Sequence, residues 1–68
     1  MEQQGTRVVA TESVQIERKV FTAEVCENHL GRCLRLTEHG GRRDRIVVPW
    51  SGVAELLGLL GRVVAVAG

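Results

Sequence analysis

Five arginines, two histidines and a cysteine are concentrated in one stretch of this 68-residue chain, HLGRCLRLTEHGGRRDRI, residues 29–46. Arginine binds phosphate through its fixed charge and paired N–H donors, whereas histidine and cysteine are ligands for zinc. The three glycines of the stretch suit hairpin turns, because glycine adopts positive φ at low cost. Three interpretations follow: a basic phosphate-binding surface, a metal site, or two turns on either side of a strand.

The metal interpretation is the weakest of the three. Cys26, His29, Cys33 and His39 supply the number of nitrogen and sulfur ligands that zinc takes. Their spacing, C-x2-H-x3-C-x5-H, fits no zinc-finger pattern, and His39 lies about 13 Å along its strand from Arg35, beyond one coordination sphere. We therefore expect no metal and no other cofactor. Cys26 and Cys33 are expected to be a pair of small, outward-facing residues, with a cross-strand disulfide as the alternative.

Catalysis has no support in the sequence, and we expect that the protein is not an enzyme. The sequence has no Ser-His-Asp set, no carboxylate pair suited to a pocket and no cofactor fingerprint. The net charge of +1 argues against a strongly basic protein but allows a charged face. No apolar run is expected to span a membrane. The N-terminus lacks the charged-then-apolar order of a signal peptide, so a cytoplasmic chain is expected.

Alternating apolar and polar side chains predict strands at residues 7–17 and 20–27. The apolar residues have even numbers in the first segment and odd numbers in the second. Because one uninterrupted strand keeps a single parity, we expect either a turn or a bulge near residues 18–19.

Residues 32–39 are predicted to form the third strand and to pair with 20–27 across a turn at 28–31. If residue 27 faces residue 32, Glu24 lies opposite Arg35, a favourable cross-strand pair. The same register pairs Cys26 with Cys33, Thr22 with Thr37, Val25 with Leu34 and Ala23 with Leu36. The arrangement is self-consistent, because the apolar residues then share one side of the hairpin.

A second turn is predicted at residues 40–44 and a fourth strand at 45–50, which Pro49 ends because it lacks an N–H donor. Ser51 is a candidate N-cap. From Val53 onward, apolar residues recur at intervals of three and four, which predicts a helix.

We expect this chain to form a homodimer. A chain of this size has a marginal core of its own, and the apolar stripe of the helix is wider than a surface helix needs. The side chains expected at the dimer interface are Leu56, Leu59, Leu60, Val63 and Val66. Residues 1–6 are expected to be a flexible N-terminus, and residues 7–68 to form one domain.

The order of these pieces resembles one repeat of the Pur-alpha (purine-rich element binding) family. The shared features are an I-x-x-K-x-F-x-x-[DE]-V run, an N-x-x-G-R turn, an L-[KR]-[IL]-x-E strand, a glycine-rich hairpin, an R-[IL]-x-[VL] strand and an amphipathic helix. They span residues 13–61 in matching order. In this chain they fall on Ile16, Lys19, Phe21, Glu24, Val25, Asn28, Gly31, Arg32, Leu34, Arg35, Leu36, Glu38, Arg45, Ile46 and Val48.

The resemblance implies an α+β fold, with a four-stranded antiparallel sheet followed by one C-terminal helix, the β-β-β-β-α PUR repeat. Residues 7–68 would be a single PUR-like repeat, and two copies would interlock as an intertwined homodimer. The fold is also similar to that of Whirly proteins. The implied function is binding of single-stranded DNA or RNA in the cytoplasm, in association with the nucleoid if the chain is bacterial.

Family members bind nucleic acid on the outer face of the sheet and its loops, and the matching positions here are Lys19, Asn28, Arg32 and Arg35. The basic hairpin adds Arg42, Arg43 and Arg45 to the expected binding residues. Thr22 and Cys33 stand where the family commonly has outward aromatics. Because each stacked base contributes ~1–3 kcal/mol, we expect weaker or more purely electrostatic binding. The alternative is a dimeric protein-interaction or structural module of the same fold, with weak or no nucleic-acid binding.

Overall fold

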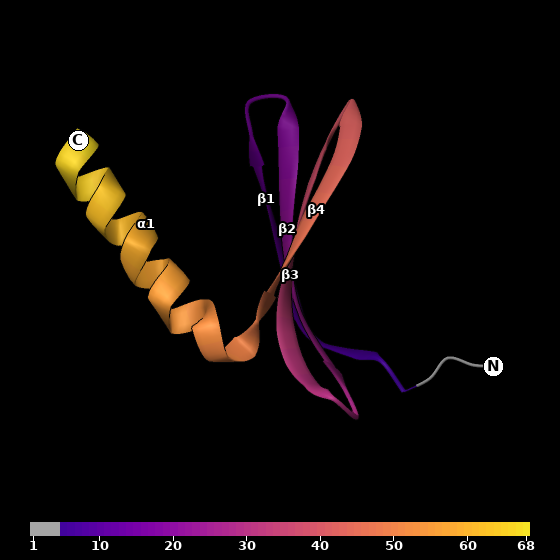
Figure 1. Ribbon diagram of the computed structural model, residues 1–68. Helices are drawn as coiled ribbons and strands as arrows, with labels where there is room; N and C mark the ends of the chain where they lie inside the picture. The colour runs from indigo at the N-terminus through magenta and orange to yellow at the C-terminus, as the bar shows by residue number, and fades with distance from the viewer. Residues whose placement is uncertain (1–4) are drawn as a thin grey trace.

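The computed structural model describes residues 5–68 (Figure 1). Its elements, in chain order, are β1 (Arg7–Ile16), β2 (Lys19–Asn28), β3 (Gly31–Gly40), β4 (Arg42–Pro49), the 3-10 helix η1 (Trp50–Gly52) and α1 (Val53–Ala67). The strands form one antiparallel sheet in the order β1-β2-β3-β4. The expected α+β architecture, a four-stranded antiparallel sheet followed by one C-terminal helix, is confirmed. Most of the expected flexible segment, residues 1–4, lies outside the described residues.

A two-residue turn joins β1 to β2 and explains the change of parity. Ile16 pairs with Lys19, which leaves Glu17 and Arg18 as the two turn residues. Glu17 has φ of 58°, and positive φ is typical of the primed turns that match the twist of hairpin strands. Of the two alternatives left open by the sequence, the turn is therefore the one found. A separate register shift lies between Val8 and Ala10, farther along β1.

The register of β2 and β3 is the one that the sequence predicts. Glu24 pairs with Arg35, and Glu27 with Arg32. The pairs Cys26–Cys33, Thr22–Thr37, Val25–Leu34 and Ala23–Leu36 are also confirmed. Charge complementarity and the shared apolar side together select this register, because a slip of one residue reverses every side chain.

The β3–β4 hairpin is tighter than predicted, and its arginines belong to the strand. Gly40 pairs with Arg42, so Gly41 alone stands outside the ladder. β4 therefore begins at Arg42, and the prediction that it starts at residue 45 is wrong. The reason is the pair of glycines. Gly40 has φ of 150° and Gly41 has φ of 100°, and these backbone conformations, which other residues rarely adopt, let the chain reverse in a short turn.

The start of the helix also differs from the prediction. Ser51 lies inside η1, Gly52 is the N-cap of α1, and no side chain caps either helix. Pro49 ends β4 with φ of −57° and ψ of 140°, and the next three residues turn as a 3-10 helix before α1 begins. The predicted capping role of Ser51 is therefore wrong, although α1 begins at Val53 as expected.

The sheet has two chemically different faces, because successive side chains of a strand point to opposite sides. The face called apolar carries Ala10, Val14, Ile16, Phe21, Ala23, Val25, Leu34, Leu36, Ile46 and Val48, together with the charged residues Arg7, Glu12, Lys19, Glu27, Arg32, Glu38, Arg42 and Asp44. The polar face carries Thr11, Ser13, Gln15, Thr22, Glu24, Arg35, Thr37, His39, Arg43 and Arg45, together with the apolar residues Val8, Val20, Cys26, Cys33, Val47 and Pro49.

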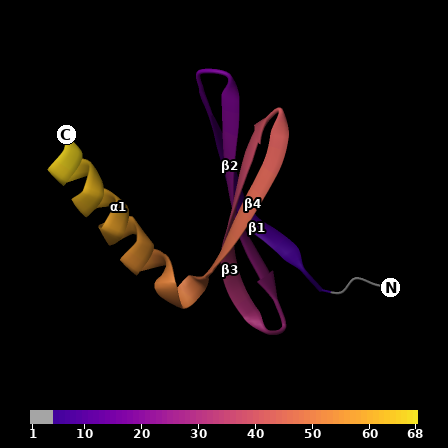
Figure 2. The same cartoon turned by 45° about the horizontal axis from the view of Figure 1, so that its top comes forward.

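Neither face of the sheet is covered by α1. The helix has its main contacts with η1 and extends away from the strands, as both views show (Figures 1 and 2). Phe21 lies on the apolar face, as its parity requires, but is 38% exposed. Within residues 5–68, Cys26 is the one buried hydrophobic residue, at 4% exposure.

The extended arrangement is visible in the dimensions of the chain. Its accessible surface is 5524 Å², whereas a compact monomer of 7.5 kDa exposes about 4,200 Å². Its radius of gyration is 14.0 Å, against about 11 Å for a compact domain of this length. A single chain therefore leaves uncovered the apolar surface that normally forms a core.

The helical segment Trp50–Ala67 is more hydrophobic than the sequence analysis assumed. Its 18 residues have a mean hydropathy of 1.5, with none buried, which by length and composition alone is enough to cross a membrane. The expectation that no apolar run spans a membrane stays a prediction, since length and composition alone do not test it. The α-helical part, 15 residues, is about 22 Å long, shorter than the ~30 Å hydrocarbon core of a bilayer.

Candidate nucleic-acid interface

The centre of the polar face is a row of hydroxyl groups that ends in a cation. Ser13 Oγ lies 2.8 Å from Thr22 Oγ1, within hydrogen-bond distance. Thr22 pairs with Thr37, which in turn pairs with Arg45 on the edge strand β4. Hydroxyls and arginines are both groups that bind phosphate oxygens in nucleic-acid complexes, so this row has the chemistry of a backbone-binding surface.

Arg35 lies on the polar face but is paired with a carboxylate. Its Nη2 is 2.7 Å from Glu24 Oε1, and its Nε donates a hydrogen bond of 2.8 Å to the same oxygen. This hydrogen bond raises the pKa of the Arg35 guanidinium above its ordinary value. The predicted cross-strand pair is thus confirmed, and the charge of Arg35 is balanced within the sheet.

Arg43 and Arg45 are the cations of the polar face that have no carboxylate partner among residues 5–68. Arg43 pairs with His39 and Arg45 with Thr37, both at exposed positions of β4. Arg42 belongs to the same strand but lies on the opposite side, across from Gly40. The basic hairpin therefore divides its three arginines between the two faces.

Lys19 lies on the side of the apolar face, at the start of β2. Its Nζ is 2.6 Å from Glu38 Oε2 on β3. The hydrogen bond and charge of Glu38, with a smaller contribution from Asp44, raise the pKa of Lys19 above its ordinary value of 10.5. The structure does not bring Lys19 together with the arginines of the polar face.

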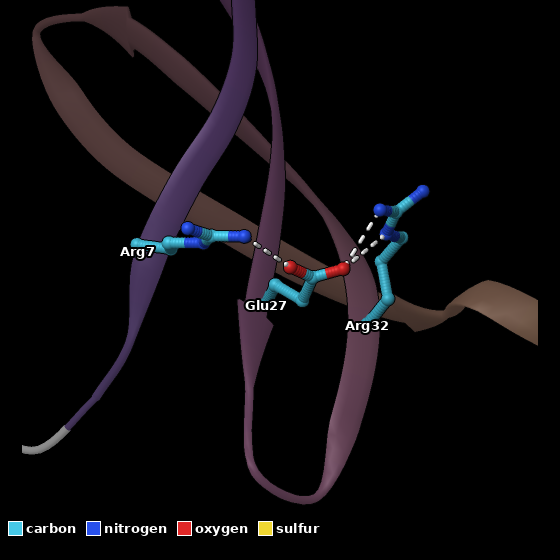
Figure 3. Close-up of polar contacts among 3 residues, drawn as sticks. All are labelled: Arg7, Glu27 and Arg32. Atoms are coloured by element: carbon cyan, nitrogen blue, oxygen red, sulfur yellow. Dashed lines mark hydrogen bonds and ion pairs between the residues drawn. The ribbon is translucent and has the colours of Figure 1, made fainter.

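Arg32 is held in a cluster at the opposite end of the sheet (Figure 3). Its Nη2 and Nε donate to Glu27 Oε2 at 2.7 and 3.1 Å, while Arg7 Nη2 donates to Glu27 Oε1 at 3.1 Å. The hydrogen bonds of Arg32 and then Arg7 lower the pKa of the Glu27 carboxyl.

Arg32 also connects this cluster to the start of the helix. Its Cζ lies 5.3 Å from the centroid of the Trp50 ring, within the range of a cation–π interaction. Trp50 is the first residue of η1, so Glu27 and Arg32 together link β1, β2 and β3 to the segment from which α1 extends. This contact gives Arg32 a structural role that the sequence did not predict.

Asn28 stabilises the β2–β3 turn through its side chain. Its Oδ1 accepts a hydrogen bond of 2.8 Å from the backbone N–H of Leu30, an arrangement by which asparagine commonly stabilises turns. Of the seven predicted nucleic-acid-binding residues, then, the structure places Arg35, Arg43 and Arg45 on the polar face, Lys19, Arg32 and Arg42 on the opposite face, and Asn28 at the β2–β3 turn.

The two cysteines are opposite each other, as predicted, but they differ in exposure. Cys26 is buried and Cys33 partly buried, and both are free thiols. Cys26 lies on the expected side of β2, with Thr22 and Glu24, but it is buried and not exposed to solvent. It pairs with Val8 on one side and Cys33 on the other, at the irregular part of β1. In the described part of the chain, no three His, Cys, Asp or Glu side chains are grouped to hold a metal ion.

No protein-family model, curated protein or solved structure matches the chain. The residues and their geometry therefore carry the functional proposal. The ion pairs of Lys19 and Arg32 were the features that sequence reasoning missed. Glu27 lies opposite Arg32 in the predicted register, so that pair had a sequence signal, whereas Lys19 and Glu38 are diagonal neighbours on adjacent strands with no such signal.

Proposed function

We propose that this protein is a homodimeric module that binds single-stranded DNA or RNA through the polar face of its sheet and its basic β3–β4 hairpin. The observation that carries the proposal is the difference between the two faces. One carries a row of hydroxyls and three arginines, whereas the other carries ten apolar residues, none of which is buried in a single chain.

Phosphate contacts dominate the proposed binding. Arg43 and Arg45 are two residues apart on an exposed edge strand, about 7 Å along β4, and the hydroxyl row continues inward from Arg45. The chain's two aromatics, Phe21 and Trp50, lie on the apolar face and in η1. The polar face therefore lacks a Phe, Tyr or Trp ring for base stacking, and affinity comes mainly from charge and hydrogen bonds.

A second copy of the chain is the proposed cover for the apolar face and α1. The surface in excess of a compact monomer is about 1,300 Å² per chain, larger than the ~800 Å² that each partner buries in a standard stable interface. The predicted interface residues on α1 support this, since Leu60 is 51% and Val66 90% exposed. A dimer buries these side chains without changing either sheet.

The second candidate is a dimeric structural or protein-interaction module without nucleic-acid affinity. The observation that favours it is the pairing of cations: Lys19, Arg32 and Arg35 each have a carboxylate partner within 3 Å. Arg43 and Arg45 distinguish the two candidates, because they are the polar-face cations still available for phosphate.

A titration of the full chain with a fluorescent single-stranded oligonucleotide at several salt concentrations tests the proposal. With two free arginines per chain and two chains, the expected slope of log affinity against log salt is about −3. Sedimentation velocity is expected to give twice the 7.5 kDa chain mass. A dimer that shows no binding at low salt would establish the second candidate, and a stable monomer would contradict the dimer.

A further inference from the structure

The helix α1 has one polar feature, a pair of opposite charges on one side. Glu55 and Arg62 are its two charged residues. Seven residues apart, they lie about 20° from each other around the helix axis and about 10 Å from each other along it. Neither has an ion-pair partner among residues 5–68.

Small residues lie beside these charges, on the side of α1 opposite Leu56, Leu60 and Val63. Ala54, Gly58, Gly61 and Ala65 follow one another at intervals of four and three, which keeps them on one side of a helix. Leu60, by contrast, is about 160° away from Gly58 around the axis. The helix thus has a bulky apolar side suited to a sheet and a side where a second helix can approach closely.

The position of the Arg62 side chain places its charge over this small-residue side. A Cβ built on Gly58 would lie 3.2 Å from Arg62 Nη1. The guanidinium therefore leans toward the helix N-terminus and over Gly58, in the direction of Glu55, as helical side chains generally do.

The pattern is self-complementary when it is reversed. Two antiparallel copies of α1 place Glu55 beside Arg62, Ala54 beside Ala65 and Gly58 beside Gly61. The midpoint of each of these three pairs lies within one residue of position 59. Parallel copies that meet through the same small residues place their charged flanks on opposite sides of the contact, so no Glu55–Arg62 pair forms. Charge complementarity thus selects one orientation, and the small residues allow contact at the same point.

We infer that α1 crosses α1 of a second copy in antiparallel orientation at residues 58–61, with two reciprocal Glu55–Arg62 ion pairs. This inference rests on the proposed homodimer and specifies which helix surface the copies share. The bulky side, with Val53, Leu56 and Leu60, is then left to cover the apolar face of a sheet. This arrangement explains why α1 is hydrophobic on nearly all sides, because its small-residue side and its bulky side are then both buried.

A charge-exchange experiment on the full chain tests the inference by sedimentation velocity. Glu55→Arg and Arg62→Glu each replace two attractive pairs with two repulsive ones, so each is expected to raise the dimer dissociation constant about tenfold or more. The double variant restores both pairs with reversed sign and is expected to return to within about threefold of the original value. Glu17→Arg makes the same charge change in the β1–β2 turn and is the control expected to have no effect.

Gly58→Leu provides a second test that does not depend on charge. Leucine raises intrinsic helix propensity, so circular dichroism is expected to show that helix content is retained while the dimer weakens. A dimer unaffected by the single charge variants, or a double variant without recovery, would overturn the crossing and leave the proposed dimer intact. A monomeric wild-type chain would overturn both the crossing and the proposed dimer. Flotation of the wild-type chain with phosphatidylcholine vesicles would show that α1 binds lipid instead.

Discussion

Arg35 and Glu24 face each other across β3 and β2 on the polar face, with Arg35 Nη2 2.7 Å from Glu24 Oε1. Both side chains are about one-quarter exposed, so the pair is partly shielded from water. The carboxylate neutralises the cation at the position where a phosphate would approach. In this sheet, therefore, Arg35 lies on the polar face, but its charge is balanced by a carboxylate of the neighbouring strand.

Glu24→Gln is expected to strengthen single-strand binding, because it frees Arg35 while keeping the shape of the side chain. One additional cation per chain is expected to steepen the salt slope by about 1.4 units for the dimer. Oligonucleotide anisotropy at several salt concentrations measures this change. Glu27→Gln is the matched control, because Glu27 lies near the β2–β3 turn and on the opposite face of the sheet from Glu24. An unchanged slope would show that Arg35 does not reach the nucleic acid.

Arg42 and Arg43 are consecutive residues of β4 that point to opposite faces, and this makes them a test of which face binds. Arg43→Ala combined with Arg45→Ala is expected to remove most of the salt dependence of binding, because both phosphate-binding cations are lost. Arg42→Ala removes one positive charge from the other side, half the charge removed by the double variant, and is expected to have a small effect. An equal loss from Arg42→Ala alone would place the interface at the hairpin tip and not on the polar face.

The pattern of the sequence predicts the sheet better than it predicts the contacts made on it. The register of Glu24 with Arg35 follows from side-chain alternation and charge, since only one pairing satisfies both. The boundary of β4 does not follow, because Gly40 and Gly41 permit several turns of different length. The ion pair of Lys19 with Glu38 is diagonal, and diagonal contacts depend on the twist of the sheet, which residue types do not specify.

The ion pairs of Glu27 are expected to make the stability of the folded chain vary with pH in the acidic range. Arg32 and Arg7 lower the pKa of the Glu27 carboxyl from its ordinary value of 4.5. A group whose pKa is lowered by folding contributes stability above its unfolded value, and this is lost as the pH falls through the folded pKa. The melting temperature of the native chain should therefore exceed that of Glu27→Gln at pH ~6, with a difference that shrinks below pH ~4.5. A difference that stays constant down to pH ~3 would contradict this origin.

Gly40 is expected to tolerate substitution less well than Gly31, although the two have similar backbone angles. Their φ values are 150° and 139°, so alanine is strained at both. A Cβ at Gly40 would also lie 3.2 Å from the Arg18 carbonyl oxygen and 3.0 Å from Lys19 Cγ, whereas nothing lies within 4 Å at Gly31. Gly40→Ala should lose about 1–3 kcal/mol more than Gly31→Ala in urea unfolding. Equal losses would mean that the Arg18–Lys19 backbone moves aside at little cost.

Phe21 and Thr22 are neighbours on β2 whose side chains lie on opposite faces, so the same substitution at each position separates the two proposed surfaces. Phe21 is 38% exposed in one chain and is covered in the proposed dimer. Phe21→Asp places an unpaired carboxylate in that interface and is expected to raise the dimer dissociation constant ~100-fold or more.

Thr22→Asp instead puts a negative charge into the hydroxyl row, where Thr22 contacts Ser13. It is expected to weaken oligonucleotide binding through repulsion of phosphate while the dimer persists. Sedimentation and anisotropy on both variants measure the two effects separately. If Thr22→Asp broke the dimer and Phe21→Asp left it intact, the assignment of the faces would be reversed, because the copies would then meet through their polar sides.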